Sequence, residues 1–245
     1  MSRLYLKSEN FNSKTVISDC IFTAPIKVAK PFCYENYIEV MMMTASAGIL
    51  DGDFYDTEIE VCESSALKFT GQSYTKLFKA SNKGASQKVK LTVKSGGKFL
   101  YFPTPIIPFG GSVFQSCTEV YLSSDSQFAM LDVISCGRKA MNEEFQFTFY
   151  RSRTAVYVDD TLEFLDNQRL SPKEVRLDGI GFFEGFSHVG MMYIYGTDNF
   201  SLPEYKDVEV AITNAHKGLC VRIFANSGDE IVRFANRIVE EINFW

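Results

Sequence analysis

Histidine is scarce in this chain of 245 residues, which contains only His188 and His216. They lie far apart, and neither belongs to an HExxH or other helical HxxxH pattern or lies near a cluster of cysteines or carboxylates. This excludes the usual sequence patterns of a dedicated imidazole metal site. The nucleophile turn GxSxG of serine hydrolases is also missing, and the pair Gly110-Gly111 lacks the lysine of a phosphate-binding loop.

The six cysteines are widely spaced, with no two of them within ten residues of each other. This spacing excludes a zinc-finger pattern and a CxxC redox pair. The N-terminal segment has no apolar signal sequence, and a chain of this size needs no disulfides to stabilise its core. The sequence therefore predicts reduced thiols and a cytoplasmic location.

Long apolar runs and an excess of positive charge are missing as well. No stretch approaches the roughly 18 uncharged apolar residues that a membrane-spanning helix requires. The 30 acidic residues outnumber the 25 basic ones, which gives a net charge of −5. Nucleic acids and anionic membranes both demand a basic surface, so neither is expected as the main partner.

Aromatic residues are abundant instead, with 22 Phe and 12 Tyr in an aromatic content of 14%. Such side chains, beside many Val, Ile and Thr, favour β-strands over helix bundles. The first two thirds of the chain consist of short runs of this kind, separated by turn signals. The predicted strands are 15–22, 37–43, 57–61, 66–70, 87–93, 98–102, 116–122, 127–134, 144–150 and 154–158.

Two segments of this series predict more detail. Residues 88–93 alternate between polar and apolar side chains, which predicts an antiparallel sheet with one solvent-exposed face. Residues 103–108 are rich in proline, which cannot donate to a sheet ladder. This segment is therefore expected to be an extended crossing loop or a sheet edge.

The last third of the chain changes character. Strands are predicted at 191–195 and 219–225. Ser201 begins a helix-start signature, and apolar residues recur at helical spacing from 205 to 215. A second capping signature at Ser227 precedes an apolar stripe that lies opposite charged side chains.

These patterns together predict the fold class and the domain organisation. The order of strand, helix, strand and helix near the C-terminus is typical of a small α+β lobe. The fold is therefore expected to be mainly β, with a many-stranded β body over residues 1–185 and a C-terminal α+β lobe with two helices over residues 186–245. The two parts are expected to form one continuous structural unit.

Acidic residues are the candidates for chemistry. Asp51 and Asp53 flank Gly52 after an apolar run, which is typical of a β-turn with solvated aspartates. Asp132 lies inside the apolar segment 128–134, where an ionised carboxylate is costly unless it is paired or binds a cation.

Arg138 follows Asp132 closely in the sequence and leaves two interpretations open. One is an ion pair between Arg138 and either Asp132 or Glu143. The other is a polar path through the β body that metal ions could use.

Short motifs in the first two thirds of the chain resemble, in order and in spacing, the urease accessory protein family UreD, which is called UreH in Helicobacter. The resemblance covers roughly residues 20–170 and rests on a GxxxGD turn at 48–53, a TxQS segment at 70–73, a proline-rich segment at 102–109 and a GRxxxxE segment at 137–143. Many members have glycine before the last glutamate, where this chain has Asn142. The residues that carry the motifs are Gly48, Gly52, Gln72, Lys76, Gly137 and Arg138.

The resemblance implies a function and a set of partners. Members of the family act as chaperone scaffolds rather than enzymes, in a complex with the accessory protein UreF and the GTPase UreG, and they dock on apo-urease. A homodimer within that complex is also possible. Nickel is expected to be bound only transiently and conducted through an internal channel, without an organic cofactor. The family fold is a layered or helical β body.

The same resemblance indicates which acids would line a metal path: Asp53, Asp132, Glu143 and Asp166. Carboxylate oxygens suit this task, because a carrier must release its ion, and nickel binds nitrogen and sulfur ligands more tightly. Carboxylates also lower the electrostatic barrier for a cation inside a protein.

The C-terminal helix, expected from Gly228 to Phe244, has two open interpretations. It either docks on UreF through apolar rings at an exposed terminus, or it closes the core. The residues proposed for docking are Phe234, Ile238, Phe244 and Trp245.

Two competing functions remain open from the residues alone. One is a glycosidase that uses two carboxylates from Asp51, Asp53, Glu143 and Glu144. The other is a passive ligand-binding β module.

Overall fold

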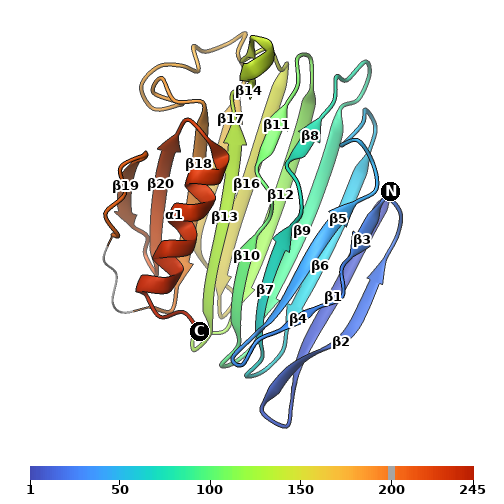
Figure 1. Cartoon of the computed structure of the whole chain (residues 1–245), viewed down its shortest axis with the longest axis vertical. Coiled ribbons are helices and arrows are strands. Elements are labelled where there is room, and N and C mark those ends of the chain that lie inside the picture. Colours follow the sequence, from blue (N-terminus) through green and yellow to red (C-terminus); the bar gives the residue numbers. More distant parts are fainter. Residues whose placement is uncertain (198–201) are drawn as a thin grey trace.

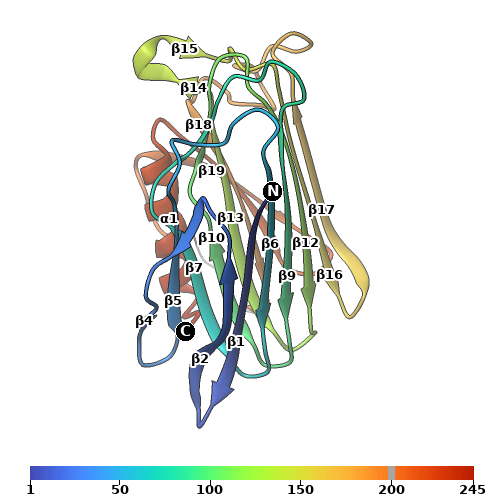
Figure 2. The ribbon, with the colours of Figure 1, turned by 90° about the vertical axis from the view of Figure 1, so that its right-hand side faces the viewer.

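A computed structural model describes residues 1–197 and 202–245. The chain winds into two β-sheets that face each other, and Figure 2 shows them edge-on. The first sheet has the order β17-β16-β12-β9-β6-β1-β2, and the second has the order β19-β20-β18-β13-β10-β7-β5-β3 with three short strands beside it. The first sheet comprises β1 (Ser2–Phe11), β2 (Lys14–Phe22), β6 (Phe54–Val61), β9 (Ala85–Val93), β12 (Val113–Leu122), β16 (Phe149–Val158) and β17 (Thr161–Leu170).

The second sheet carries the other long strands and the short ones at its margin (Figure 1). A separate two-stranded sheet is formed by β14 (Gly137–Arg138) and β15 (Glu143–Glu144), which flank a 3-10 turn at Lys139–Met141. The strands of the second sheet are β3 (Ile26–Val28), β4 (Phe32–Cys33), β5 (Ile38–Thr44), β7 (Ala66–Gly71), β8 (Thr75–Leu77), β10 (Lys98–Phe102), β11 (Ile106–Pro108), β13 (Gln127–Ser135), β18 (His188–Tyr195), β19 (Val208–Asn214) and β20 (Leu219–Ala225).

The central strands form a parallel coil. The chain alternates between the second sheet (β5, β7, β10, β13) and the first sheet (β6, β9, β12, β16). From β6 onward, each of these strands pairs in parallel with the strand one coil earlier, as β12 does with β9 and β10 does with β7. Apolar side chains between the sheets form the main core, which confirms the mainly β, layered prediction.

The predicted antiparallel pairing of residues 88–93 is wrong. In β9 the side chains of Val89, Leu91 and Val93 are buried and those of Lys88 and Lys90 are exposed, as the alternation indicates. Both neighbours of β9 are nevertheless parallel to it. Alternation of polar and apolar side chains indicates that one face of a sheet is exposed to solvent. It does not indicate whether the neighbouring strand is parallel or antiparallel.

The predicted strand 144–150 is divided in the structure. Residues 143 and 144 belong to β15, and β16 begins only at Phe149. Phe145 adopts a left-handed backbone conformation, with a φ of 54°, and this breaks the extended run.

The predicted helix over residues 205–215 is also wrong. Ser201, its proposed cap, lies outside the described residues, and Val208–Asn214 form the edge strand β19, which is antiparallel to β20. Val208, Val210 and Ile212 also fit a period of two, and β20 supplies the hydrogen-bonding partner that a short helix would not need. The described part of the chain therefore contains one α-helix rather than two.

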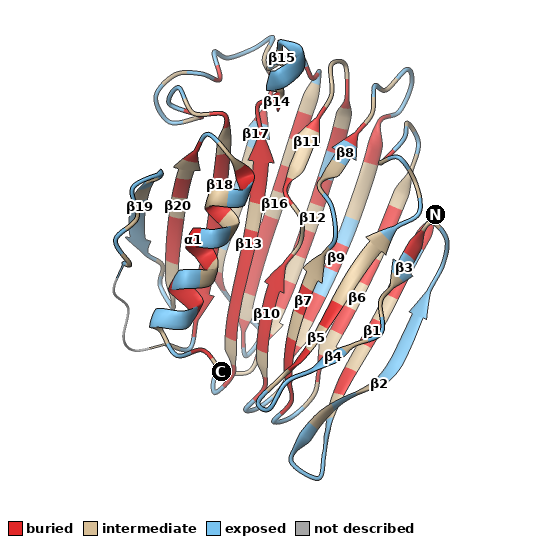
Figure 3. Cartoon of the chain, in the orientation of Figure 1, coloured by how far each residue is buried: buried red, intermediate tan, exposed pale blue. Residues whose placement is uncertain are grey.

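That helix, α1 (Gly228–Glu241), begins at the predicted cap, where the Ser227 hydroxyl accepts a hydrogen bond from the Asp229 N–H at 3.2 Å. It covers the outer face of the second sheet over β13, β18 and β20 (Figures 1 and 3). Ile231, Phe234 and Ile238 on its inner side belong to a second apolar cluster with these strands. Within 1–197 and 202–245, no helix is long and apolar enough to cross a bilayer.

Candidate metal path

Asp132 lies on β13, and its side chain is directed between the two sheets. The Ser152 hydroxyl of β16, in the opposite sheet, donates a hydrogen bond to Asp132 Oδ2 at 2.9 Å. Withdrawal from water raises the pKa of Asp132 above its ordinary value, and the nearby charge of Asp166 raises it further. Asp132 is therefore a carboxylate inside the β body, and no cationic side chain among the described residues forms an ion pair with it.

Asp166 approaches the same region from β17. Its carboxylate forms an ion pair with the guanidinium of Arg222 on β20, so the pair links the two sheets across the open side of the coil. Asp132, Asp166 and Arg222 together line a space of only about 10 Å³, which we call the neck. The structure thus brings together two of the four acids predicted for a metal path.

The neck has a larger space on each side. The outer cavity, of about 520 Å³, is lined by Asp166 and Arg222 together with Phe224 and the segment 181–184. The inner chamber, of about 60 Å³, is lined by Asp132, Tyr150 and the hydroxyl-bearing Thr118 and Ser116. Asp166 borders the outer cavity and the neck, and Asp132 borders the neck and the chamber.

The chamber contains an unused polar group. The Tyr150 hydroxyl is buried and has no hydrogen-bond partner among the described residues. Burial raises the pKa of Tyr150 well above its ordinary value, and the charge of Asp132 adds to this effect. An orphaned buried hydroxyl beside a carboxylate indicates a space suited to water or to a hydrated cation.

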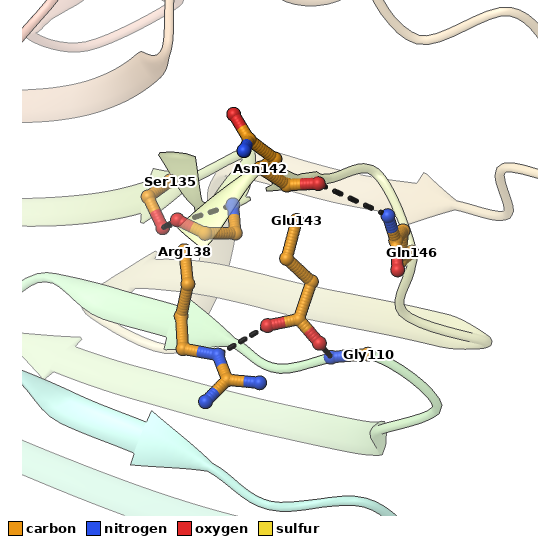
Figure 4. Close-up of polar contacts among 7 residues, drawn as sticks. Gly110, Ser135, Arg138, Asn142, Glu143 and Gln146 are labelled. Carbon is orange, nitrogen blue, oxygen red and sulfur yellow. Dashed lines mark hydrogen bonds and ion pairs between the residues drawn. The ribbon is translucent and has the colours of Figure 1, made fainter. Parts of the chain in front are cut away.

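The structure places Glu143 outside this path, in a clamp that Figure 4 shows. Its carboxylate forms an ion pair with Arg138 and accepts the Gly110 N–H at 2.6 Å. The bond from Arg138 is the main cause that lowers the pKa of Glu143. The Arg138 guanidinium also lies 4.1 Å from the centre of the Phe109 ring. The interpretation of Arg138 as an ion-pair partner of Glu143 is confirmed.

Backbone geometry explains the other residues of the GR segment. Gly137 has a φ of 131°, and a Cβ there would lie 2.3 Å from the carbonyl oxygen of Glu143. Asn142, where many family members have glycine, adopts the left-handed conformation that asparagine tolerates better than most residues. Asparagine in place of glycine at position 142 therefore preserves the conformation of this turn.

Asp53 is also remote from the neck, because it lines neither the neck nor the chamber. Its Oδ2 accepts the Leu50 N–H at 2.8 Å within its own turn. Gly48, at the start of this turn, lies so close to β8 that a Cβ would be 2.5 Å from the carbonyl oxygen of Lys76. Gly52 has a φ of 83°, which favours glycine.

The motif segments gather at one end of the coil. Gly48, Gln72, Phe109 and Gly137 all follow strands of the second sheet, and the carboxyl ends of its coil strands β5, β7, β10 and β13 meet at one edge. The Gln72 N–H donates to the Met42 carbonyl at 3.0 Å, and the Ile49 N–H donates to that of Lys76 at 2.8 Å. These contacts are structural and do not form a metal site.

Asp51, at the same end of the coil, accepts four hydrogen bonds from backbone N–H groups. Its Oδ2 accepts the N–H groups of Ser81 and Asn82 at 2.9 Å each, and its Oδ1 accepts those of Lys83 and Gly84 at 3.2 and 2.8 Å. These bonds, that of Ser81 first, lower the pKa of Asp51 below its ordinary value. Asp51 therefore fixes the loop before β9.

We expect Asp51→Asn to lower the melting temperature by a few degrees at neutral pH, because an amide nitrogen would face two backbone N–H groups. A depressed pKa means that the carboxylate stabilises the fold above its ordinary pKa of about 3.9 and loses this effect as the pH falls through the folded-state pKa. The difference in melting temperature from the natural chain should therefore vanish in acid. Asp19→Asn, at an exposed position on β2, is the control and should change neither value. A constant difference from pH 7 down to pH 3 would contradict this role.

The residues proposed for docking are largely packed inside. The side chains of Phe234 and Ile238 are buried on the inner side of α1, and Phe244 is also buried, at 3% exposure. The expectation of an exposed Phe244 ring is therefore wrong. Trp245 is partly exposed and stacks on Tyr37, with ring centroids 4.3 Å apart.

The sequence analysis missed three residues that line the path or contact its carboxylates. Arg222 carried a usable signal, because a charge inside the apolar strand 219–225 is as unusual as Asp132 in its own strand. Ser152 and Tyr150 gave none, since both fit an ordinary alternating strand. Their role depends on which strands face each other across the core.

The carboxylates proposed for a glycosidase are occupied in other ways. Asp51 accepts four backbone N–H groups, and Glu143 is held by Arg138 and Gly110. No group of three or more His, Cys, Asp or Glu side chains in residues 1–197 and 202–245 has the geometry to hold a metal ion. The arrangement around the neck is therefore suited to weak, water-assisted contacts rather than to a closed metal site.

Comparison with known proteins shows the family of the chain. The family described as "UreD urease accessory protein" matches residues 1–243. The chain is 38% identical to urease accessory protein UreD of Acetivibrio thermocellus, over 94% of this chain and 92% of that protein. It is 32% identical to urease accessory protein UreH of Helicobacter hepaticus, over 95% of this chain and 90% of that protein. The chain belongs to the UreD family of urease accessory proteins.

Proposed function

We propose that this chain is a non-enzymatic scaffold in urease maturation that conducts nickel through its interior towards the urease metallocentre. In this proposal nickel is the cargo and not a resident cofactor. The chain would act with a UreF-like accessory protein and a UreG-like GTPase, assembled on the urease apoenzyme. A homodimer within that assembly belongs to the same proposal.

The observation that carries the proposal is a set of three neighbouring spaces that share lining residues. The carboxylate of Asp166 borders both the outer cavity and the neck, and that of Asp132 borders both the neck and the chamber. Family membership supplies the biological setting, because the relatives are named urease accessory proteins.

The chemistry of the lining supports transport rather than storage. The described residues that line the neck and the chamber offer carboxylate, hydroxyl and amide oxygens and the thioethers of methionines. They include neither imidazole nor thiolate, the ligands that hold nickel tightly. A divalent ion on oxygen ligands keeps part of its water and can leave again. The two negative charges also offset the cost of bringing a cation into a low-dielectric interior.

Reconstitution of urease tests the proposal directly. Purified urease apoprotein, UreF- and UreG-like proteins, GTP and nickel are combined with and without this chain, and urease activity is measured. We expect activation to depend on the chain and the proteins to co-elute in gel filtration. Equal activation without the chain would contradict the proposal, and glycoside turnover by the isolated chain would favour the glycosidase instead.

A further inference from the structure

Arg222 stands at the boundary between the outer cavity and the neck, because its side chain lines both. We propose that Arg222 is the gate of the path: it closes the neck while it is paired with Asp166, and it opens the neck when its guanidinium moves to Glu184 in the outer cavity. This inference rests on the proposed function and adds a means of control to it.

The closed state follows from size and charge. The neck, at about 10 Å³, has room for about one water molecule. A divalent cation that keeps part of its hydration shell cannot share this space with a guanidinium. The positive charge of Arg222 also repels a cation and occupies Asp166, the carboxylate that borders both the outer cavity and the neck.

The open state has a defined partner in the outer cavity. Glu184 lines this cavity and accepts the Gly181 N–H at 3.2 Å. Phe224 lies two residues after Arg222 on the same strand and lines the same cavity. The Arg222 side chain is 32% exposed, so it is not locked into the core.

A second arginine in the same cavity provides a matched control. Arg169 lines the outer cavity, but its guanidinium binds Glu174 with two hydrogen bonds, one of them at 2.9 Å. It does not border the neck. Removal of Arg169 changes the charge of the outer cavity as much as removal of Arg222 does, and it leaves the neck intact.

The first test measures nickel binding to the purified full chain, with NiCl2 alone as the probe. Arg222→Gln should bind nickel at least tenfold more tightly and take it up faster, because Asp132 and Asp166 lose their counter-charge. Arg222→Lys should lie between this variant and the natural chain, and Arg169→Gln should match the natural chain. Nickel binding by folded Arg222→Gln that equals or falls below that of the natural chain overturns the gate.

The second test uses the proposed open state and does not depend on Arg222→Gln folding well. Glu184→Gln should slow nickel uptake several-fold in stopped-flow measurements, because the open position of Arg222 loses its partner. In an Arg222→Lys background the same change should have a smaller effect, since the shorter ammonium holds Asp166 less firmly. Equal slowing in both backgrounds would mean that Glu184 only attracts cations to the surface, and it would refute the gate.

These outcomes are distinct from failure of the proposed function. If Asp132→Asn and Asp166→Asn bind nickel as the natural chain does, there is no path. If both variants weaken binding and Arg222→Gln behaves as the natural chain does, the path exists and Arg222 is not its gate.

Discussion

Replacement of Asp132 by asparagine is expected to lower the nickel-dependent activation of urease at least tenfold in the reconstituted system. Asparagine has nearly the same size and can still accept the hydrogen bond from Ser152. The change therefore removes a negative charge from the junction of neck and chamber and leaves the packing unchanged. A cation inside the β body would lose one of the two charges that offset its desolvation.

The control for this variant is Asp53→Asn. Both acids were predicted for the metal path, but Asp53 lies in a surface turn and borders neither the neck nor the chamber. We expect Asp53→Asn to activate urease as well as the natural chain does. Unchanged activation by Asp132→Asn, with the complex intact in gel filtration, would eliminate the role proposed for Asp132.

The second large effect concerns α1. Phe234 is 1% exposed and packs against the outer face of the second sheet, together with Ile231 and Ile238. Phe234→Ala should lower the free energy of unfolding by about 3–5 kcal/mol, because it removes a buried ring and leaves a cavity. Urea denaturation of the isolated chain measures this loss.

Glu240→Ala, on the exposed side of the same helix, should change the free energy of unfolding by less than about 0.5 kcal/mol. The burial of Phe234 supports the interpretation of α1 as a core-closing helix. A Phe234→Ala chain that stays as stable as the natural one and loses only its accessory partner would instead support docking through this stripe.

Local patterns predicted much of the fold. The strands 98–102 and 219–225 have the predicted limits, and α1 begins at the predicted cap. These elements combine clear turn signals with one consistent period. The prediction for the edge strand β19 failed because its apolar residues fit both a helical period and a period of two. Pairing with β20 selects the strand. The predicted direction of the strands beside β9 was wrong, because strand direction depends on connections that run through the opposite sheet.

Only part of the candidate site could be predicted from the sequence. A carboxylate inside an apolar strand singles out Asp132 without any knowledge of the fold. Asp53 and Glu143 were predicted from motifs, and their motifs serve a turn and a clamp at one end of the coil. The neck itself depends on which strands meet across the core, and no local pattern encodes the meeting of β17 with β20.

The parallel coil also sets the order in which the protein can be built during synthesis. Each central strand needs the strand one coil earlier as its template, so the body can grow from the N-terminal coils onward. The neck also needs β17 and β20, which are synthesised after the central strands of the coil. A nascent or C-terminally shortened chain would thus hold a formed β body before it holds a passage. The neck, and with it the nickel passage that we propose, therefore forms only after most of the chain has been synthesised.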